Sequence, residues 1–202
     1  DMVLRPRDLL LAHREVLSQC GGREKGLRVV EIANKFPRVE AVLASIKEKY
    51  EYVGKTFSIV VPEKIEQIIE EGQALKHCLD RSDRYFERIA NQESYIVFLR
   101  RTKAMEQPYY TLEIEPDGTT RQKRTVGDNQ NNDYHRAEKF LKKWQAAIRP
   151  RLSQEDFERQ EISRQLRMYE LESLRNDKVT VHGGIHAGEL LADILEADLM
   201  EA

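Results

Sequence analysis

The sequence predicts an α+β protein, in which a small antiparallel sheet of about three to five strands is flanked by helices and followed by a long helical extension. Three observations lead to this prediction. The spacing of apolar residues changes from helical to alternating in mid-chain, a Pro116-Asp117-Gly118 turn joins two alternating segments, and charged helical patterns dominate the end. We therefore expect an α+β domain over residues 1–150 and a charged helical extension over residues 151–202.

The first half of the chain is expected to combine helices with strands. A period near 3.6 among apolar residues predicts helices, and dense apolar runs closed by Pro62 or by arginines predict strands. Gly21 and Gly22 are expected to end the first helix. In order, the expected elements are helix 6–20, helix 38–50, strand 52–61, helix 63–77, helix 82–90 and strand 95–99.

The second half is expected to place a hairpin before long amphipathic helices. Ser153 and Asp156 resemble a capping box at the start of the longest helix. The apolar stripe of that helix is narrow, which suits packing on a neighbouring helix or a partner; its residues are Phe157, Ile162, Leu166 and Tyr169. The expected elements are strand 109–115, strand 119–126, the polar loop 127–133, helix 134–148, helix 153–176 and an acidic final helix.

Composition narrows the classes of function. The chain has 33 Lys and Arg against 35 Asp and Glu, a net charge of −2, so it has no global attraction for nucleic acid or an anionic membrane. No apolar run approaches the roughly 20 residues of a membrane span, and no signal peptide is visible. We expect a cytoplasmic protein that does not contact membranes. Because Asp1 precedes Met2, we also expect a fragment of a longer protein.

The two cysteines and the histidines do not form a recognisable metal site. Cys20 and Cys78 are far apart and are expected to be reduced, buried thiols. No C-x-x-C motif is present, and the glycines between His182 and His186 argue against a helix that would bring them together. The sequence therefore predicts no metal and no cofactor.

The densest run of chemically capable residues extends from Glu70 to Arg100. Gly72 lies inside a predicted helix at a cost of about 1 kcal/mol relative to Ala, which suggests a close backbone approach or an irregular helix. His77 and Cys78 are about 100° apart on a helix and do not face each other, so a reactive thiolate would need another base, such as His135. The alternative is a buried Cys78 and a His77 that hydrogen-bonds the helix end.

The strand over residues 109–115 adds a polar face to this run. Thr111 and Glu113 point to the same side, opposite Leu112, and Arg100 ends the preceding strand. We expect a Glu113–Arg100 pair that is either structural or holds a phosphate or carboxylate ligand.

The stretch from residue 96 to residue 150 is locally basic. It contains 11 Lys and Arg against 7 Asp and Glu, a net charge of +4. A basic return strand beside an Asn-rich loop could follow a phosphate backbone, and nearby tyrosines could stack bases. The alternative is a basic strand that serves solubility and protects a sheet edge. The candidate nucleic-acid residues are Tyr109, Tyr110, Arg121, Lys123, Arg124, Asn129 and Tyr134.

Four stretches, in this order, resemble the PcfJ-like family of bacterial conjugative plasmids, prophages and related mobile elements. They are Glu71 to Cys78, Ile96 to Arg100, Pro108 to Glu113, and Arg121 to Asn131 leading into Trp144. The resemblance extends from about Pro6 to Trp144. It implies a biological setting but no established reaction. The candidate residues that it suggests are Glu71, His77, Cys78, Arg100, Thr111, Glu113, Gln122 and Asn129.

Three hypotheses follow. The first is a nucleic-acid-associated accessory protein of a mobile element. The second is a transferase or hydrolase whose catalytic residues converge on one pocket. The third is an interaction module that docks a partner, or a second copy of the chain, through residues 153–176. The candidate catalytic residues of the second hypothesis are Glu71, His77, Cys78, Arg100 and Glu113.

Overall fold

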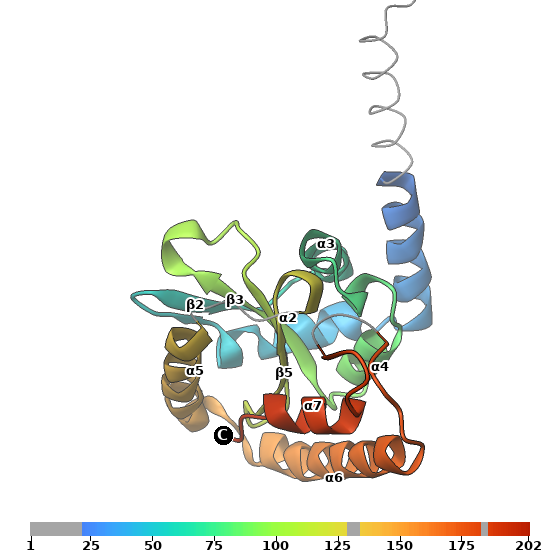
Figure 1. The fold of residues 1–202 in the computed structure, drawn as a ribbon. Coiled ribbons are helices and arrows are strands. Elements are labelled where there is room, and N and C mark those ends of the chain that lie inside the picture. Colours follow the sequence, from blue (N-terminus) through green and yellow to red (C-terminus); the bar gives the residue numbers. More distant parts are fainter. Residues whose placement is uncertain (1–21, 129–133, 183–185) are drawn as a thin grey trace, which may run out of the picture.

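The computed structural model describes residues 22–128, 134–182 and 186–202 (Figure 1). Within these ranges, one five-stranded antiparallel sheet is packed against helices, and the C-terminal part is helical. The predicted α+β class is therefore confirmed. None of the helices in these ranges is both long and apolar enough to cross a bilayer.

The sheet is a meander, because its strands lie side by side in the order in which they occur in the chain. Glu113 lies opposite Ile96 on one neighbouring strand and opposite Gln122 on the other, while Thr111 lies opposite Arg124. Side chains at paired positions share a face, so these residues form what we call the polar face. The strands are β1 Tyr52–Val53, β2 Phe57–Val60, β3 Tyr95–Arg101, β4 Tyr110–Ile114 and β5 Thr120–Arg124.

The helices largely follow the predicted order, with short 3-10 turns between some of them. A helix over residues 22–35 comes first. The others are α2 Val39–Tyr50, α3 Ile65–Leu75, α4 Arg84–Ala90, α5 Tyr134–Ile148, α6 Gln154–Asn176 and α7 Leu191–Asp198. The 3-10 turns are η1 Cys78–Asp80, η2 Thr102–Ala104, η3 Val126–Asp128 and η4 Arg149–Arg151.

The face of the sheet opposite the polar face packs against α2 and α5. Leu112, Tyr50 and Trp144 are all buried there. The Trp144 indole N–H donates to the carbonyl oxygen of Tyr50 at 2.9 Å, and the Tyr50 hydroxyl donates to the carbonyl oxygen of Pro116 at 2.6 Å. The donors of Trp144 and Tyr50 thus each have a partner inside this core.

The prediction of one strand over residues 52–61 is wrong. The segment forms two strands, β1 and β2, joined by a turn in which the Gly54 N–H donates to the Phe57 carbonyl oxygen at 2.9 Å. A Cβ atom at residue 54 would lie 2.6 Å from that oxygen and 2.8 Å from the Phe140 ring. The turn therefore requires glycine, which a search for apolar runs does not weigh.

Two differences concern the first helices. The helix over residues 22–35 was not predicted, and Gly22 lies at its start. Its apolar residues, such as the fully buried Ile32, are few, so its periodic signal is weak. The helix predicted over residues 6–20 lies outside the described ranges, as does Cys20.

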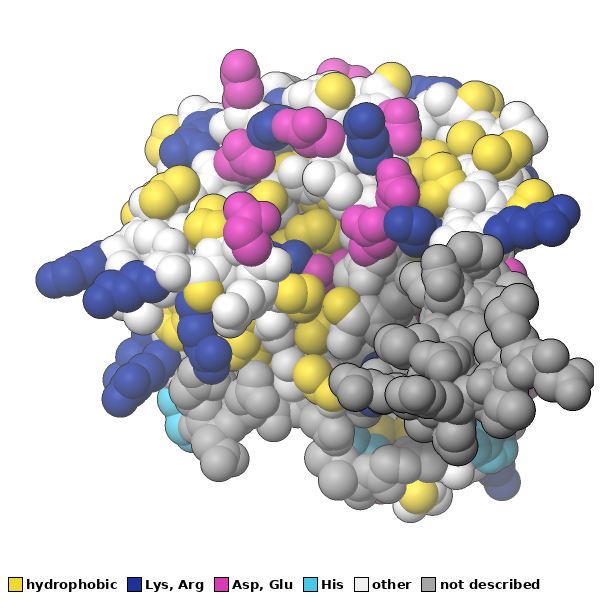
Figure 2. Space-filling view, turned by 90° about the horizontal axis from the view of Figure 1, so that it is seen from above, with side chains coloured by type: hydrophobic (Ala, Val, Ile, Leu, Met, Phe, Trp, Pro, Cys, Tyr) yellow, Lys and Arg dark blue, Asp and Glu magenta, His cyan; other side chains and the backbone are white. Residues whose placement is uncertain are grey.

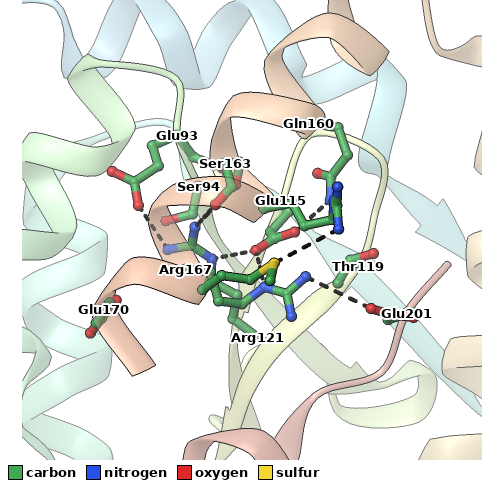
Figure 3. Close-up of polar contacts among 12 residues, drawn as sticks. Glu93, Ser94, Glu115, Thr119, Arg121, Gln160, Ser163, Arg167, Glu170 and Glu201 are labelled. Carbon is green, nitrogen blue, oxygen red and sulfur yellow. Dashed lines mark hydrogen bonds and ion pairs between the residues drawn. The ribbon is translucent and has the colours of Figure 1, made fainter. Parts of the chain in front are cut away.

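A cluster of buried ion pairs joins α6 to the sheet (Figure 3). Glu115, which follows β4, accepts hydrogen bonds from Arg121 at 2.6 Å and from Arg167 of α6 at 2.8 Å. Arg121 also donates to the carbonyl oxygen of Ser163 at 2.8 Å.

Closer to the C-terminus, Thr120 and Met200 exchange two backbone hydrogen bonds of 2.9 Å. The C-terminal segment is thus bonded to the sheet edge, while the division into two domains stays a prediction.

The predicted start of α6 is confirmed, but its packing differs from expectation. Ser153 and Asp156 form the capping box. The side that faces the sheet buries Ser163 and Arg167, together with Asp156 and Leu171. The predicted apolar stripe is therefore exposed in this chain, from 37% at Phe157 to 74% at Tyr169. Docking of a partner or second copy on it stays a prediction.

Removing one charge of the buried cluster should destabilise the protein strongly. Arg167→Gln leaves Glu115 short of one of its cations in a water-poor site, and we expect a loss of about 3–5 kcal/mol in the free energy of unfolding. Arg164→Gln, on the same helix, removes an exposed pair with Glu161 and should change little. Urea unfolding followed by circular dichroism measures both. Equal effects of the two changes would contradict the assigned role of the cluster.

Candidate functional site

A pocket of about 600 Å³ lies over the polar face of the sheet. Its volume falls in the roughly 300–1,000 Å³ range of small-molecule sites. Thr111, Glu113, Gln122 and Arg124 form part of its floor, and the segment from His77 to Tyr85 provides one wall. The C-terminal segment provides another wall, with the apolar residues Val181, Leu191, Ile194 and Leu195.

Gly72 allows the chain to place His77 and Cys78 at this pocket. After α3 the backbone folds back, and the His77 N–H donates to the Gly72 carbonyl oxygen at 3.1 Å. A Cβ atom at residue 72 would lie 2.7 Å from the Asp80 backbone nitrogen and 3.1 Å from the Leu79 Cβ. Of the two explanations predicted for Gly72, the structure supports the close backbone approach.

His77 is held by a chain of buried hydrogen bonds. Its Nε2 lies 3.0 Å from the Thr111 hydroxyl oxygen, and that hydroxyl lies 3.5 Å from a carboxylate oxygen of Glu71. Arg100 donates two hydrogen bonds, of 2.8 and 2.5 Å, to the Glu71 carboxylate. If the Thr111 hydroxyl donates to Glu71, His77 donates through Nε2. This arrangement fixes the imidazole at the edge of the pocket.

The expected pairing of Glu113 with Arg100 is wrong. Arg100 pairs with Glu71, and Glu113 pairs instead with Arg88 of α4 at 2.8 Å. Arg100 and Glu71 are buried beside the pocket and are not among its lining residues. Of the five candidate catalytic residues, the structure brings His77, Cys78 and Glu113 to the pocket surface. The other two support His77 through Thr111.

Glu113 is a buried carboxylate on the floor of the pocket. Its carboxylate accepts hydrogen bonds from Arg88, from Ser94 at 2.6 Å and from Gln122 at 3.2 Å. Burial alone would raise its pKa, but the positive charges of Arg88 and Arg121, with the Ser94 hydrogen bond, hold the pKa below its ordinary value. The side chain is therefore ionised at neutral pH and can only accept hydrogen bonds.

Cys78 is exposed, which corrects the expectation of a buried thiol. Its sulfur lies 3.7 Å from the Tyr85 hydroxyl oxygen, and both residues line the pocket. Burial, with the negative charge of Glu113, raises the pKa of Tyr85, so this hydroxyl stays protonated at neutral pH. His135, proposed as a distant base, lies on α5, which packs on the opposite face of the sheet.

The predicted nucleic-acid residues largely have protein partners. Arg121 and Lys123 are only 4% and 2% exposed, and Tyr109 is also buried. Burial lowers the pKa of Lys123, while the charge of Asp198 opposes that shift. Arg124 pairs with the same Asp198 and lines the pocket. Tyr110 is buried in the core, and Asn129 lies outside the described residues.

Exposed cations gather elsewhere, on a region that we call the basic surface. In Figure 2, Lys and Arg side chains gather on the left, the side on which Figure 1 places β2 and α5. Six exposed cations of the β1–β2 turn, η2 and α5 define the basic surface, and within the described ranges no ion pair neutralises them. They are Lys55 of the β1–β2 turn, Lys103 of η2, and Arg136, Lys139, Lys142 and Lys143 of α5.

Packing contacts place the segments that carry the basic surface next to one another. The Phe140 ring of α5 contacts Phe57 and Tyr52, with ring centroids 5.7 and 5.9 Å apart, on the strands that flank the turn. The Thr102 N–H donates to the Thr56 carbonyl oxygen at 2.9 Å, which brings the Lys103 segment beside the Lys55 turn. The sequence-based prediction missed this surface. The helical spacing of residues 134–148 could have revealed it, because it places the cations opposite the apolar side.

The described residues contain no group of three or more His, Cys, Asp or Glu side chains placed to hold a metal ion. His186 lines the pocket, where its ring nitrogen lies 3.3 Å from the Glu189 carboxylate. The pocket thus brings a thiol, an imidazole and a carboxylate around one space.

Comparisons with known proteins identify relatives but no activity. The model of a family described as PcfJ-like protein matches residues 1–139. An uncharacterized protein of Listeria innocua, Lin1253/Lin1744, is 21% identical over 147 residues, which cover 73% of this chain and 30% of that protein. The chain thus spans less than a third of this relative. No solved structure matches.

The first prediction for this site concerns Gly72. In Gly72→Ala, the new methyl group collides with backbone of the η1 turn, and we expect a loss of about 1–3 kcal/mol in unfolding free energy. Gly26→Ala is the matched control, since residue 26 is also helical and a Cβ atom there would meet no other atom within 4 Å. It should gain up to about 1 kcal/mol. Thermal unfolding distinguishes the two, and stabilisation by both would contradict the close approach.

The second prediction concerns the charge on Glu113. Its pKa is lower in the folded protein than its ordinary 4.5, so its contribution to stability is present above pH 4.5 and is lost as the pH falls through the folded pKa. Glu113→Gln should cost about 3–5 kcal/mol at pH 7. The difference from wild type should shrink below pH 4.5.

Urea unfolding between pH 7 and pH 3 measures this difference. Glu172→Gln, on the exposed side of α6, provides the control and should follow the wild-type curve. A constant difference between Glu113→Gln and wild type over the whole pH range would refute an ionised, ion-paired Glu113.

Proposed function

The chain belongs to the PcfJ-like family, and from this premise we propose that it is an accessory protein of a bacterial mobile element that binds the phosphate backbone of nucleic acid. The mobile-element setting rests on the family resemblance. The binding activity is supported by one observation, the six cations of the basic surface that no ion pair neutralises within the described ranges. The proposal keeps the predicted partner but moves the contact from β5 to α5 and the neighbouring turns.

The uncompensated positive charge is concentrated in one region of the chain. The whole chain carries a net charge of −2, and many of its other cations are paired with carboxylates, such as Lys25 with Glu66 and Glu70. On α5, in contrast, Arg136, Lys139, Lys142 and Lys143 accompany only Glu138. Uncompensated like charges repel one another, and a polyanion that displaces its own counterions relieves this repulsion. Such contacts position a strand without reading its sequence.

Reversal of two charges tests this proposal. Lys139→Glu with Lys143→Glu should weaken binding to a labelled oligonucleotide at least tenfold, and should lower the slope of log affinity against log salt by about 1.4–1.8 for two lost phosphate contacts. Fluorescence anisotropy on single-stranded and duplex DNA and RNA, from low to moderate salt, gives both values.

The control for this test is the pair Arg23→Glu with Arg38→Glu. These residues are exposed, form no ion pair within the described ranges and lie outside the basic surface. This variant has the same change in net charge and should keep most of the binding. Absence of wild-type binding at low salt, or equal losses in the two variants, would rule out the proposed interface.

The pocket supports a second function, ligand binding with a transferase or hydrolase reaction. The observation in its favour is that His77, Cys78 and Glu113 line one pocket of ligand size. Both reactions begin with ligand binding, so binding is tested first. Ser82→Trp should fill the pocket from its rim and remove ligands found by ligand-observed NMR with a library of small metabolites. Ser45→Trp, exposed on α2, should retain them.

A further inference from the structure

The floor of the pocket presents a carboxylate beside a carboxamide. Glu113 and Gln122 lie opposite each other on β4 and β5, and Gln122 donates to Glu113 at 3.2 Å. One carboxylate oxygen of Glu113 already accepts from Arg88 and Ser94, whereas the other has Gln122 as its neighbour. A ligand above this pair meets an ionised acceptor next to a group that can both donate and accept.

The walls of the pocket suit a flat ring. On one side, Leu191, Ile194 and Leu195 of α7 are apolar. On the other, His77 and Tyr85 offer ring faces or edges. A planar ligand with an apolar face and a polar edge can pack between such walls while its edge reaches the floor.

The charged groups of the lining are already balanced. Glu113 pairs with Arg88, while Arg84 pairs with Glu170 and Arg124 with Asp198. A ligand group that carries a full charge would find its counter-charge among these residues already engaged in a pair. The occupant of the floor is therefore uncharged.

We infer that the pocket binds an amino-bearing nucleobase of the adenine or cytosine type; this rests on the proposal that the pocket is a ligand site. A carboxylate accepts from the exocyclic amino group of cytosine, and a Gln side chain pairs with the amino group and ring nitrogen of adenine. A base with a keto group at the same place puts an acceptor against the Glu113 carboxylate and must shift to bring its ring N–H there instead, so we expect it to bind less tightly. The base belongs either to a free nucleoside or to an unpaired nucleotide of a strand.

Matched ligands test this inference on the full chain. Adenosine differs from inosine, and cytidine from uridine, by an amino group in place of a keto group. Isothermal titration calorimetry should show that the amino member of at least one pair binds about tenfold more tightly or better, the usual value of one correct base contact. Equal binding of amino and keto members overturns the inference.

Variants locate the nucleoside-binding site and distinguish failure of the base inference from failure of the proposal that the pocket binds a ligand. Gln122→Leu should reduce the preference for the amino group, Ser82→Trp should abolish nucleoside binding, and Ser45→Trp should leave it unchanged. Circular dichroism verifies the fold of each variant, and Gln122→Leu serves because Glu113→Gln is expected to unfold more easily. Nucleoside binding that survives Ser82→Trp overturns the inference. If no nucleoside binds, but other ligands bind and are lost in Ser82→Trp, only the base inference fails; if nothing binds, both proposals fail.

An oligonucleotide arm distinguishes the two sources of the base. A single strand that ends in adenine is compared with one that ends in an abasic site, in wild type and in Ser82→Trp. A preference for adenine that disappears in Ser82→Trp identifies an unpaired nucleotide of a strand as the occupant. Equal affinity for the two strands, together with selective adenosine binding, identifies a free nucleoside. Equal affinity for both strands without nucleoside selectivity overturns the inference.

Discussion

The rest of the structure depends on one interaction, the ion pairing of two buried carboxylates, Glu113 and Glu115, with arginine side chains. Both are almost fully shielded from solvent, at 2% and 0% exposure. An isolated charge at such a depth is prohibitively unfavourable, so each needs a guanidinium at hydrogen-bond distance. Arg88 comes from α4, Arg121 from β5 and Arg167 from α6. Charge compensation within one small cluster therefore links two helices, α4 and α6, to the sheet.

The same cluster connects stability to the candidate site. Glu113 is both a member of the ion-pair network and part of the pocket floor, so its orientation is set by groups that no ligand would touch. On the other side of the pocket, the Glu71–Arg100 pair holds Thr111 and, through it, His77. A pre-positioned polar floor of this kind reduces the conformational entropy that binding would otherwise cost.

Pairing also explains how a chain of nearly balanced charge can present a basic surface. Most arginines of the interior form ion pairs with carboxylates, as Arg121 does with Glu115. Because the two charges of a pair cancel, these arginines add little to the electrostatic potential outside the protein. The lysines of α5 have no such partners within the described ranges, so their charge is expressed outwards. Position in the fold, more than residue type, decides which cations remain available to an anionic partner.

The sequence by itself determined the α+β class, most elements of the sheet and helices, and the close approach at Gly72, because these depend on local periodicity, turn residues and the lack of a side chain. It also brought His77, Cys78 and Glu113 under consideration from residue type alone. Only the tertiary structure decided which charges pair. Arg100 meets Glu71 and not Glu113, since pairing depends on the approach of α3 to the sheet, a contact between residues 29 positions apart. The same long-range packing buried Arg121, whereas the helical spacing of residues 134–148 already places the cations of α5 on the side away from its apolar residues.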